Sequence, residues 1–251
     1  MGREHDAFVG RMSLLAIPLS VLLLAGCATA EPGRSKLPSD PVSRPTAARA
    51  SASVGASLDK TAVEASLDAA VAAGPARFRT TYGLTAEQAG YAQTMSRSDG
   101  IIDLSASRSL AITEDYPGLA LSTKREVALV GHRLFARPLP GSGPWEDRSG
   151  GARVFMGLDV AGDDAVAVLR NTLSEAAGWT VIASEPGDPA GSIRVRAGQG
   201  GAADIDVVID ASGRLVSVVR QSIPSKPGGG RNRYEMTFTE FGVPLEFDAP
   251  S

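Results

Sequence analysis

Hydrophobic positions along the chain fall into three stretches that differ in period and in density. From Met12 to Leu24 apolar residues run on without a charge, and residues 28–57 carry almost no large apolar side chain. From residue 58 onward, short stretches of alternating apolar and polar residues dominate, and helical spacing interrupts them twice. The pattern predicts a leader over 1–26, a linker over 27–57 and one folded domain over 58–251.

Helical spacing marks two segments of the domain. The first, LDKTAVEASLDAAVAAGP, begins at Leu58 and stops at Gly74-Pro75. The second begins after Asp163 or Asp164, either of which can cap it, and ends at Gly178. Each segment places its apolar residues on one stripe: Val63, Leu67, Ala70 and Val71 in the first, and Val166, Leu169, Leu173 and Ala176 in the second.

Strand-like alternation covers most of the remainder, with turn residues between the stretches. In the last stretch Tyr234, Met236 and Phe238 share one face, which is typical of a half-buried antiparallel strand. Turns are expected at Ser98-Asp99-Gly100 and at Gly131-His132-Arg133. About ten short strands are expected, and the eleven candidate stretches are residues 77–82, 91–97, 101–105, 109–113, 124–130, 134–137, 180–184, 192–197, 203–210, 215–223 and 233–241.

The two apolar helix stripes need a partner, and the apolar face of a large sheet is the available one. The sequence therefore predicts an α+β domain in which a curled antiparallel sheet wraps over two amphipathic helices.

The apolar run near the N-terminus has the layout of an export signal. Arg3 and Arg11 precede it, and small residues close it. It is too short to span a membrane comfortably, which takes roughly 20 apolar residues. Leu24-Ala25-Gly26-Cys27 resembles a bacterial lipobox, which implies cleavage before Cys27 and a diacylglycerol on its sulfur. Two acyl chains hold a protein on a membrane where one would not.

Cys27 is the only cysteine of the 251 residues, so no intramolecular disulfide can form. A buried structural thiol is the competing interpretation, but the position after the apolar run favours an anchor. We expect the protein at the extracytoplasmic face of the cell membrane.

Charge is distributed unevenly along the chain. Residues 27–57 hold four basic and two acidic residues, whereas residues 58–251 hold 19 basic and 24 acidic ones. No basic stripe is present, so nucleic acid is not expected as a partner. The linker is rich in Ala, Ser and Pro and cannot bury enough surface to offset its ordering entropy. We expect it to be a flexible tether.

Residues with catalytic or metal-binding potential are few and scattered. His132 stands in a turn with no nucleophile motif nearby, so an exposed turn residue is the favoured interpretation over a general base. Asp204, Asp206 and Asp210 alternate along a strand, which indicates a polar face and not a cation site. We expect no enzymatic activity, no metal and no cofactor.

Several segments together resemble a known family, the actinobacterial LppX/LprAFG-type lipoproteins, whose domain is LolA/LolB-like. They are Cys27 with its lipobox, GIIDL from Gly100, the hairpin EVALVGHRLFARP followed by Trp145, IDASGRLVSV, and the closing TFTEFGVPLEFDAP. The resemblance implies a half-barrel over helices, with an apolar cavity between the two layers that binds a lipid or a lipidated molecule.

Apolar side chains are the candidates for lining such a cavity, although a dry core is the alternative for each of them. The candidates are Val127, Leu129, Val154, Val207, Met236 and Phe238. The expected role is binding an acyl-chain-bearing lipid or glycolipid for transport or presentation by a monomer, with an envelope transporter as a further partner. The alternative is a non-enzymatic adaptor or sensor that binds a protein partner with the same fold.

Overall fold

The structure is a computed structural model, and it describes most of the chain from residue 52 onward. The described residues are 52–86, 91–116, 118–141, 143–149, 154–155, 158–159, 165–197, 203–223, 229–248 and 250. The expected leader, Cys27, most of the expected tether, and Asp163 and Asp164 lie outside these residues. Within them, neither helix has the length and apolar character needed to cross a membrane.

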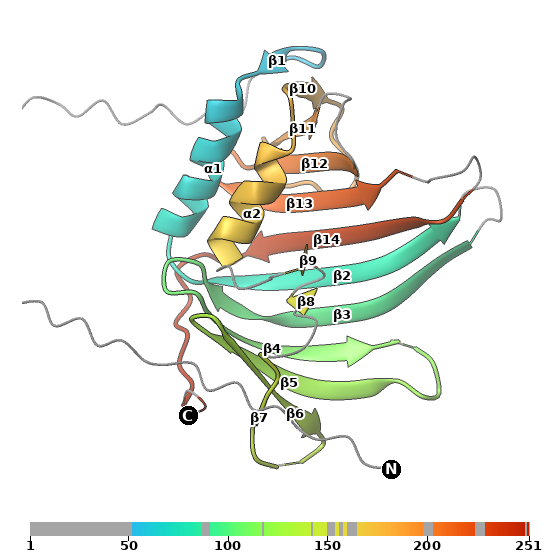
Figure 1. Ribbon diagram of the computed structural model, residues 1–251. Helices are drawn as coiled ribbons and strands as arrows, with labels where there is room; N and C mark the ends of the chain where they lie inside the picture. The colour runs from blue at the N-terminus through green and yellow to red at the C-terminus, as the bar shows by residue number, and fades with distance from the viewer. Residues whose placement is uncertain are drawn as a thin grey trace, which may run out of the picture. The chain divides into compact units, whose positions relative to one another are not determined.

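Twelve strands form one antiparallel sheet in the order β1-β10-β11-β12-β13-β14-β2-β3-β4-β5-β6-β7 (Figure 1). Along the chain their bounds are β1 Ser57–Leu58, β2 Ala76–Ala86, β3 Tyr91–Asp103, β4 Arg108–Asp115, β5 Thr123–Val130, β6 Arg133–Leu139, β7 Glu146–Asp147, β10 Trp179–Ile182, β11 Ile193–Ala197, β12 Ala203–Ile209, β13 Leu215–Ser222 and β14 Arg231–Thr239. Strands β8 (Val154–Phe155) and β9 (Leu158–Asp159) form a separate pair.

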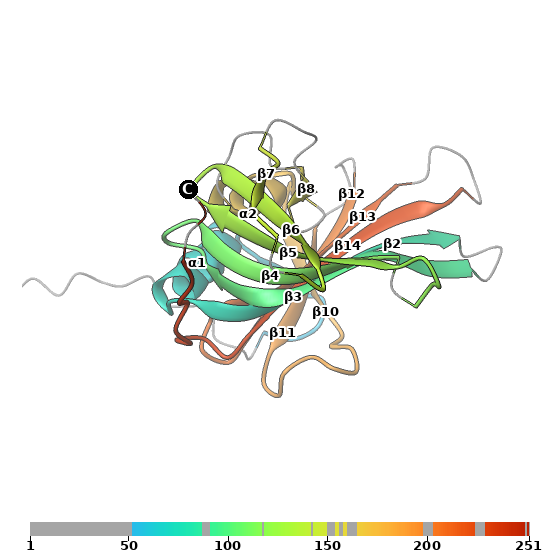
Figure 2. The ribbon, with the colours of Figure 1, turned by 90° about the horizontal axis from the view of Figure 1, so that it is seen from below.

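The sheet bends strongly without closing, because β1 and β7 remain its two edges (Figure 2). The predicted α+β class, a curled antiparallel sheet with amphipathic helices packed on it, is confirmed.

Helix α1 (Lys60–Ala72) begins where Asp59 accepts a hydrogen bond from the Thr61 amide at 3.2 Å, an N-cap that satisfies a free donor. Helix α2 (Ala165–Ser174) packs against α1, and α1 packs against β13. Both helices lie over the same face of the sheet, across the half that contains β10–β14 (Figure 1). We call this the inner face.

Alternation along each strand separates the two faces of the sheet. On β2, Phe78 and Thr80 are buried on the inner face, whereas Arg77 and Arg79 are exposed on the outer face. The inner face and both helices share one apolar core that runs from Trp179 on β10 to Leu129 on β5. Burial of these stripes is the main favourable term for the fold.

The expected turn at Ser98-Asp99-Gly100 is wrong, because these residues lie inside the single long strand β3. Asp99 is held there by Arg79, at 2.6 Å from Oδ1, and by Arg97, at 3.3 Å from Oδ2. A Cβ on Gly100 would stand 2.2 Å from the Leu110 carbonyl oxygen, so glycine serves a close approach of two strands. A Ser-Asp-Gly sequence usually marks a turn, but here the ion pairs and the close approach override it.

The folded domain also begins earlier than residue 58. The Gly55 amide donates to the Val181 carbonyl at 2.8 Å, and the Val181 amide donates to the Ala56 carbonyl at 2.8 Å. Ala52 and Ala56 pack on the core. The expected flexible tether is therefore corrected at its end, because residues 52–57 belong to the folded domain.

Candidate functional site

Five of the six expected cavity residues lie on the inner face of the main sheet. Leu129, Val207, Met236 and Phe238 are buried there, at 5% exposure or less. Val127 shares that face but is only half-buried. The sixth, Val154, lies on β8 of the separate two-stranded pair and not in the main sheet.

A row of small side chains crosses the inner face at the β3–β6 half of the sheet. The strand registers align Phe78 with Gly100, Gly100 with Ala111, Ala111 with Val127, and Val127 with Ala136. Beyond Phe78 the row holds no side chain larger than valine. Within the described residues, α1 makes its main sheet contact with β13, in the other half. The row thus consists of small apolar side chains, of which Ala111 and Ala136 are buried, at 5% and 8% exposure.

Sequence reasoning missed several inner-face residues that complete this surface, among them Phe78, Ile102 and Ala111, which are all buried. Phe78 stands between two arginines, and Ile102 follows the segment expected as a turn, so neither stood out as core. The alternation Arg77-Phe78-Arg79-Thr80 was the signal that could have identified Phe78.

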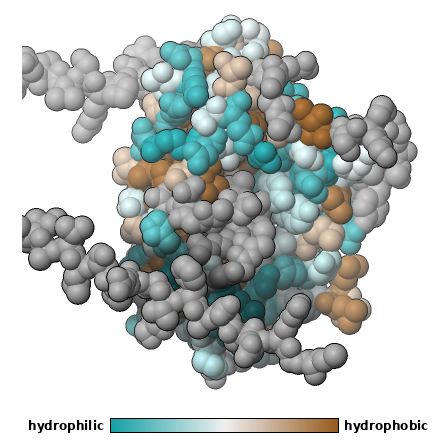
Figure 3. Space-filling view, viewed as in Figure 1, coloured by the Kyte–Doolittle hydropathy of each residue, from teal (hydrophilic) through white to brown (hydrophobic). Residues whose placement is uncertain are grey.

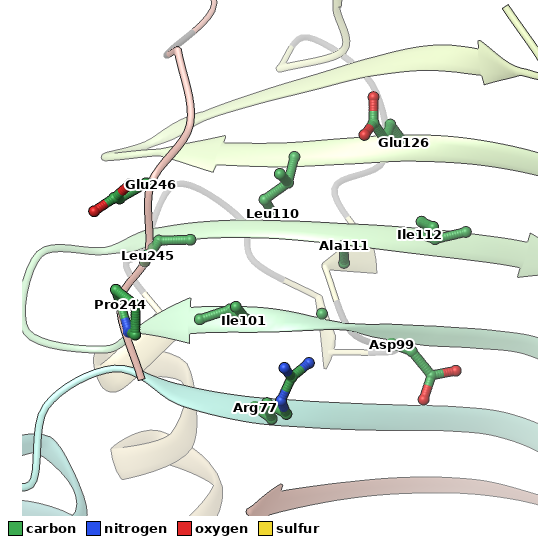
Figure 4. A pocket seen from close by; sticks show the side chains of 11 residues that line it. Arg77, Asp99, Ile101, Leu110, Ala111, Ile112, Glu126, Pro244, Leu245 and Glu246 are labelled. Carbon is green, nitrogen blue, oxygen red and sulfur yellow. The ribbon is translucent and has the colours of Figure 1, made fainter. Parts of the chain in front are cut away.

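The outer face carries a pocket of about 500 Å³ under the C-terminal segment (Figure 4). Ile101, Leu110 and Ile112 form the apolar floor of the pocket. Its charged border consists of Arg77, Asp99, Glu126 and Glu246. The segment that covers it is held by the Gly242 amide, which donates to the Pro75 carbonyl at 2.7 Å. Farther on, Phe247 lies 5.0 Å from the Arg108 guanidinium. This pocket was not expected from the sequence.

Ion pairs occupy the charged residues of the outer face. Arg194 is 7% exposed and forms a bidentate pair with Asp188, at 2.6 and 3.0 Å. Its bonds to Asp188 raise the pKa of Arg194 despite burial. Arg196 is bidentate to Asp206, and Arg231 pairs with Asp204.

These pairs explain the three aspartates that alternate near the end of β12. Asp210 binds its own turn, where it accepts from the Ser212 and Arg214 amides, both at 2.9 Å. Asp204 and Asp206 are paired with arginines. In the described part of the chain no cluster of His, Cys, Asp and Glu could hold a metal. His132 is exposed in the turn between β5 and β6.

Comparisons with known proteins add little to this geometry. No family model and no curated protein matches the chain. A LolA superfamily protein from Nitrosomonas europaea is similar in structure over 73% of this chain and 95% of that chain, with 9% sequence identity and a TM-score of 0.31. A DUF1329 family protein from Desulfovibrio piger is similar over 74% and 93%, with 12% identity and a TM-score of 0.30.

These TM-scores carry no argument about function. The domain is described as a half-barrel because of its own strand order and the position of its helices. The resemblance to the actinobacterial LppX type stays a prediction from the sequence.

Proposed function

We propose that this protein is a lipid-anchored extracytoplasmic protein that binds an acyl-chain-bearing lipid on the inner face of its curled sheet, for transport or presentation in the cell envelope. Cys27, after its lipobox-like sequence, is the proposed anchor. The proposed activity is binding, without catalysis.

The observation that carries the proposal is the row Gly100, Ala111, Val127 and Ala136. An acyl chain needs a long apolar surface with few polar groups, and aliphatic walls hold it as well as aromatic ones. Small side chains take up little room on this face, and the bend of the sheet makes it concave (Figure 2). Each methylene moved from water onto it contributes about 0.8 kcal/mol.

Binding is tested by placing a large side chain on this row. Val127 is the position of choice because it is half-buried, whereas Val207 is fully buried and a tryptophan there would overpack the core. The protein is isolated from its own host, and its cargo is measured by native mass spectrometry. We expect acylated lipid on the wild type and its loss from Val127→Trp, with thermal denaturation as the check on folding.

The matched control is Ile112→Trp. Ile112 is on neighbouring β4 but on the outer face, where it is 50% exposed, so the control adds the same side chain without entering the inner face. Absence of lipid from the wild type, or equal lipid in both variants, would overturn the binding proposal.

The anchor is tested separately. Cys27→Ala removes the proposed acylation site, and we expect the protein to leave the membrane fraction or to remain unprocessed. Mass spectrometry of the mature N-terminus that shows an unmodified thiol would contradict the anchor and leave the cargo proposal standing.

The outer-face pocket favours a second candidate function, an envelope adaptor that binds a protein partner. The apolar floor of the pocket and its charged border suit a peptide that offers an apolar side chain beside a charged one. The same two variants separate the candidates, because the adaptor loses its partner in Ile112→Trp and not in Val127→Trp. Crosslinking in intact cells provides the measurement.

A further inference from the structure

Most of the highly exposed large apolar side chains lie toward one end of the sheet, three of them in one turn and the fourth four strands away. Among the described residues, four of the six such side chains lie there: Tyr116, Leu119, Leu121 and Ile223, which are 46%, 51%, 88% and 52% exposed. The first three belong to the turn between β4 and β5, and Ile223 follows the last residue of β13. We call these four residues the rim.

Strand registers place the rim at a single end of the sheet. Asp115 at the end of β4 pairs with Ser96, Ser96 with Tyr82, and Tyr82 with Tyr234. Tyr234 pairs in turn with Arg220, near the end of β13. These strand ends point away from the helices in Figure 1, and apolar surface shows at the same margin in Figure 3.

Backbone hydrogen bonds hold the described residues of the β4–β5 turn, whose large apolar side chains are exposed. The Tyr116 amide donates to the Met95 carbonyl at 2.6 Å, and the Ser122 amide donates to the Leu119 carbonyl at 3.0 Å. Gly118 takes a φ of 82°, a conformation that glycine adopts without strain. A hydrogen-bonded turn that leaves two leucines and a tyrosine exposed indicates a surface that is covered in use.

The charges beside the turn are already neutralised. Lys124 lies 3.8 Å from Glu114, and Arg125 lies 2.6 Å from Asp115. Paired charges cost less to bring toward a medium of low dielectric than isolated ones. The composition of the rim, aliphatic tips with a tyrosine, matches side chains that sit at the boundary between lipid headgroups and acyl chains.

We propose that the rim is a membrane-contacting surface that inserts into the outer part of the bilayer carrying the lipid anchor. The proposal rests on the proposed function for the location of the protein. The expected tether has 24 residues from Ala28 to Ser51, and a flexible chain of that length would span roughly 25–30 Å on average, enough for the domain to lie on its own membrane. In this orientation the inner faces of β4 and β5 run from the lipid surface toward Ala111 and Val127.

The test uses the fact that Cys27 is the only cysteine. The full chain is isolated from membranes as Leu121→Cys and as Tyr116→Cys, labelled with a nitrobenzoxadiazole fluorophore and reconstituted into phosphatidylcholine–phosphatidylglycerol vesicles. The matched control is His132→Cys, an exposed turn position at the other end of β5. We expect a blue shift at positions 121 and 116, with quenching by spin-labelled lipid, and neither effect at position 132.

The parent chain without an added cysteine distinguishes the two proposals. If it takes up label, Cys27 is a free thiol and the anchor fails; the rim is then measured in a Cys27→Ser background with the same vesicles. If the labels at positions 121 and 116 emit in vesicles as a water-exposed fluorophore does, the rim proposal is overturned. This holds whether or not Cys27 is acylated. Unchanged thermal melts of the labelled chains show that the fold is intact.

Discussion

At the scale of single residues, the strongest dependence is expected at the buried pair of Arg194 and Asp188. Replacing Asp188 by Asn leaves the Arg194 guanidinium buried, with Glu185 at 3.3 Å and Asp206 at 3.9 Å as the remaining acids. Loss of one partner of a buried pair costs about 3 kcal/mol. Urea denaturation measures the free energy of unfolding. Asp68→Asn is the control, because its pair with Arg170 is solvent-exposed and contributes less than about 1 kcal/mol.

The same pair predicts a dependence on pH. Burial raises the pKa of Asp188, but the hydrogen bonds from Arg194 and from the Glu185 amide outweigh burial, and the pKa lies below its ordinary value. A carboxyl whose pKa is lowered by folding stabilises the protein above the unfolded pKa of about 4, and this contribution is lost as pH falls through the folded value. The stability deficit of Asp188→Asn should therefore shrink below about pH 4. A deficit that stays constant into acid would contradict the ion pair.

His132 is the opposite case at this scale. It is exposed in the two-residue turn between β5 and β6. His132→Ala should change the free energy of unfolding by less than about 0.5 kcal/mol, as surface substitutions do, and should leave the lipid content unchanged. If His132→Ala lost biological activity while its fold stayed intact, that result would support an enzymatic function.

At the scale of elements, local pattern predicted most of what the structure contains. Short strand-like stretches between turn residues placed the strands from β4 to β6 and from β11 to β14, and helical spacing with Gly74 placed α1. Residues 215–219 of β13 are all buried, so both faces of that strand are covered and alternation does not mark it. The pairing of β14 with β2 and of β1 with β10 could not be predicted, since it joins segments far apart in the chain. Alternation put Met236 on one face of the last strand. The small-residue row depends on four hairpin registers, and of the four turns that set them only Gly131-His132-Arg133 was marked as a hairpin in the sequence.

Gly100 provides the prediction at the scale of the sheet. A Cβ there would stand 2.2 Å from the Leu110 carbonyl oxygen and 2.6 Å from the Ala111 Cα, and both are backbone atoms that cannot turn aside. Gly100→Ala should force β3 and β4 apart and lower the free energy of unfolding by about 1–3 kcal/mol, the usual cost of overpacking. Gly143→Ala is the control, since nothing lies within 4 Å of its Cβ position. Equal denaturation midpoints for the two variants would show that the strands do not approach so closely.

At the scale of the whole molecule, the sheet divides the protein into two surfaces of different chemistry. Its outer face carries ion pairs, such as Arg79 with Asp99 and Arg196 with Asp206. Its inner face carries the helices on one half and the small apolar row on the other. The proposed binding of an acyl chain would use this division, because the chain would replace water on the inner face only.

Binding to the inner face should raise the stability of the whole domain by mass action. A ligand at 100 times its dissociation constant stabilises the folded state by about 2.7 kcal/mol, and for a domain of this size that corresponds to a rise in Tm of roughly 5–10 °C. Calorimetry of delipidated protein with palmitoyl-lysophosphatidylglycerol, kept below its micelle concentration, measures the shift. Ile112→Trp should keep the shift and Val127→Trp should lose it, because only the second fills the inner face. A lipid-dependent shift that survives in Val127→Trp but disappears in Ile112→Trp would place the binding site in the outer pocket.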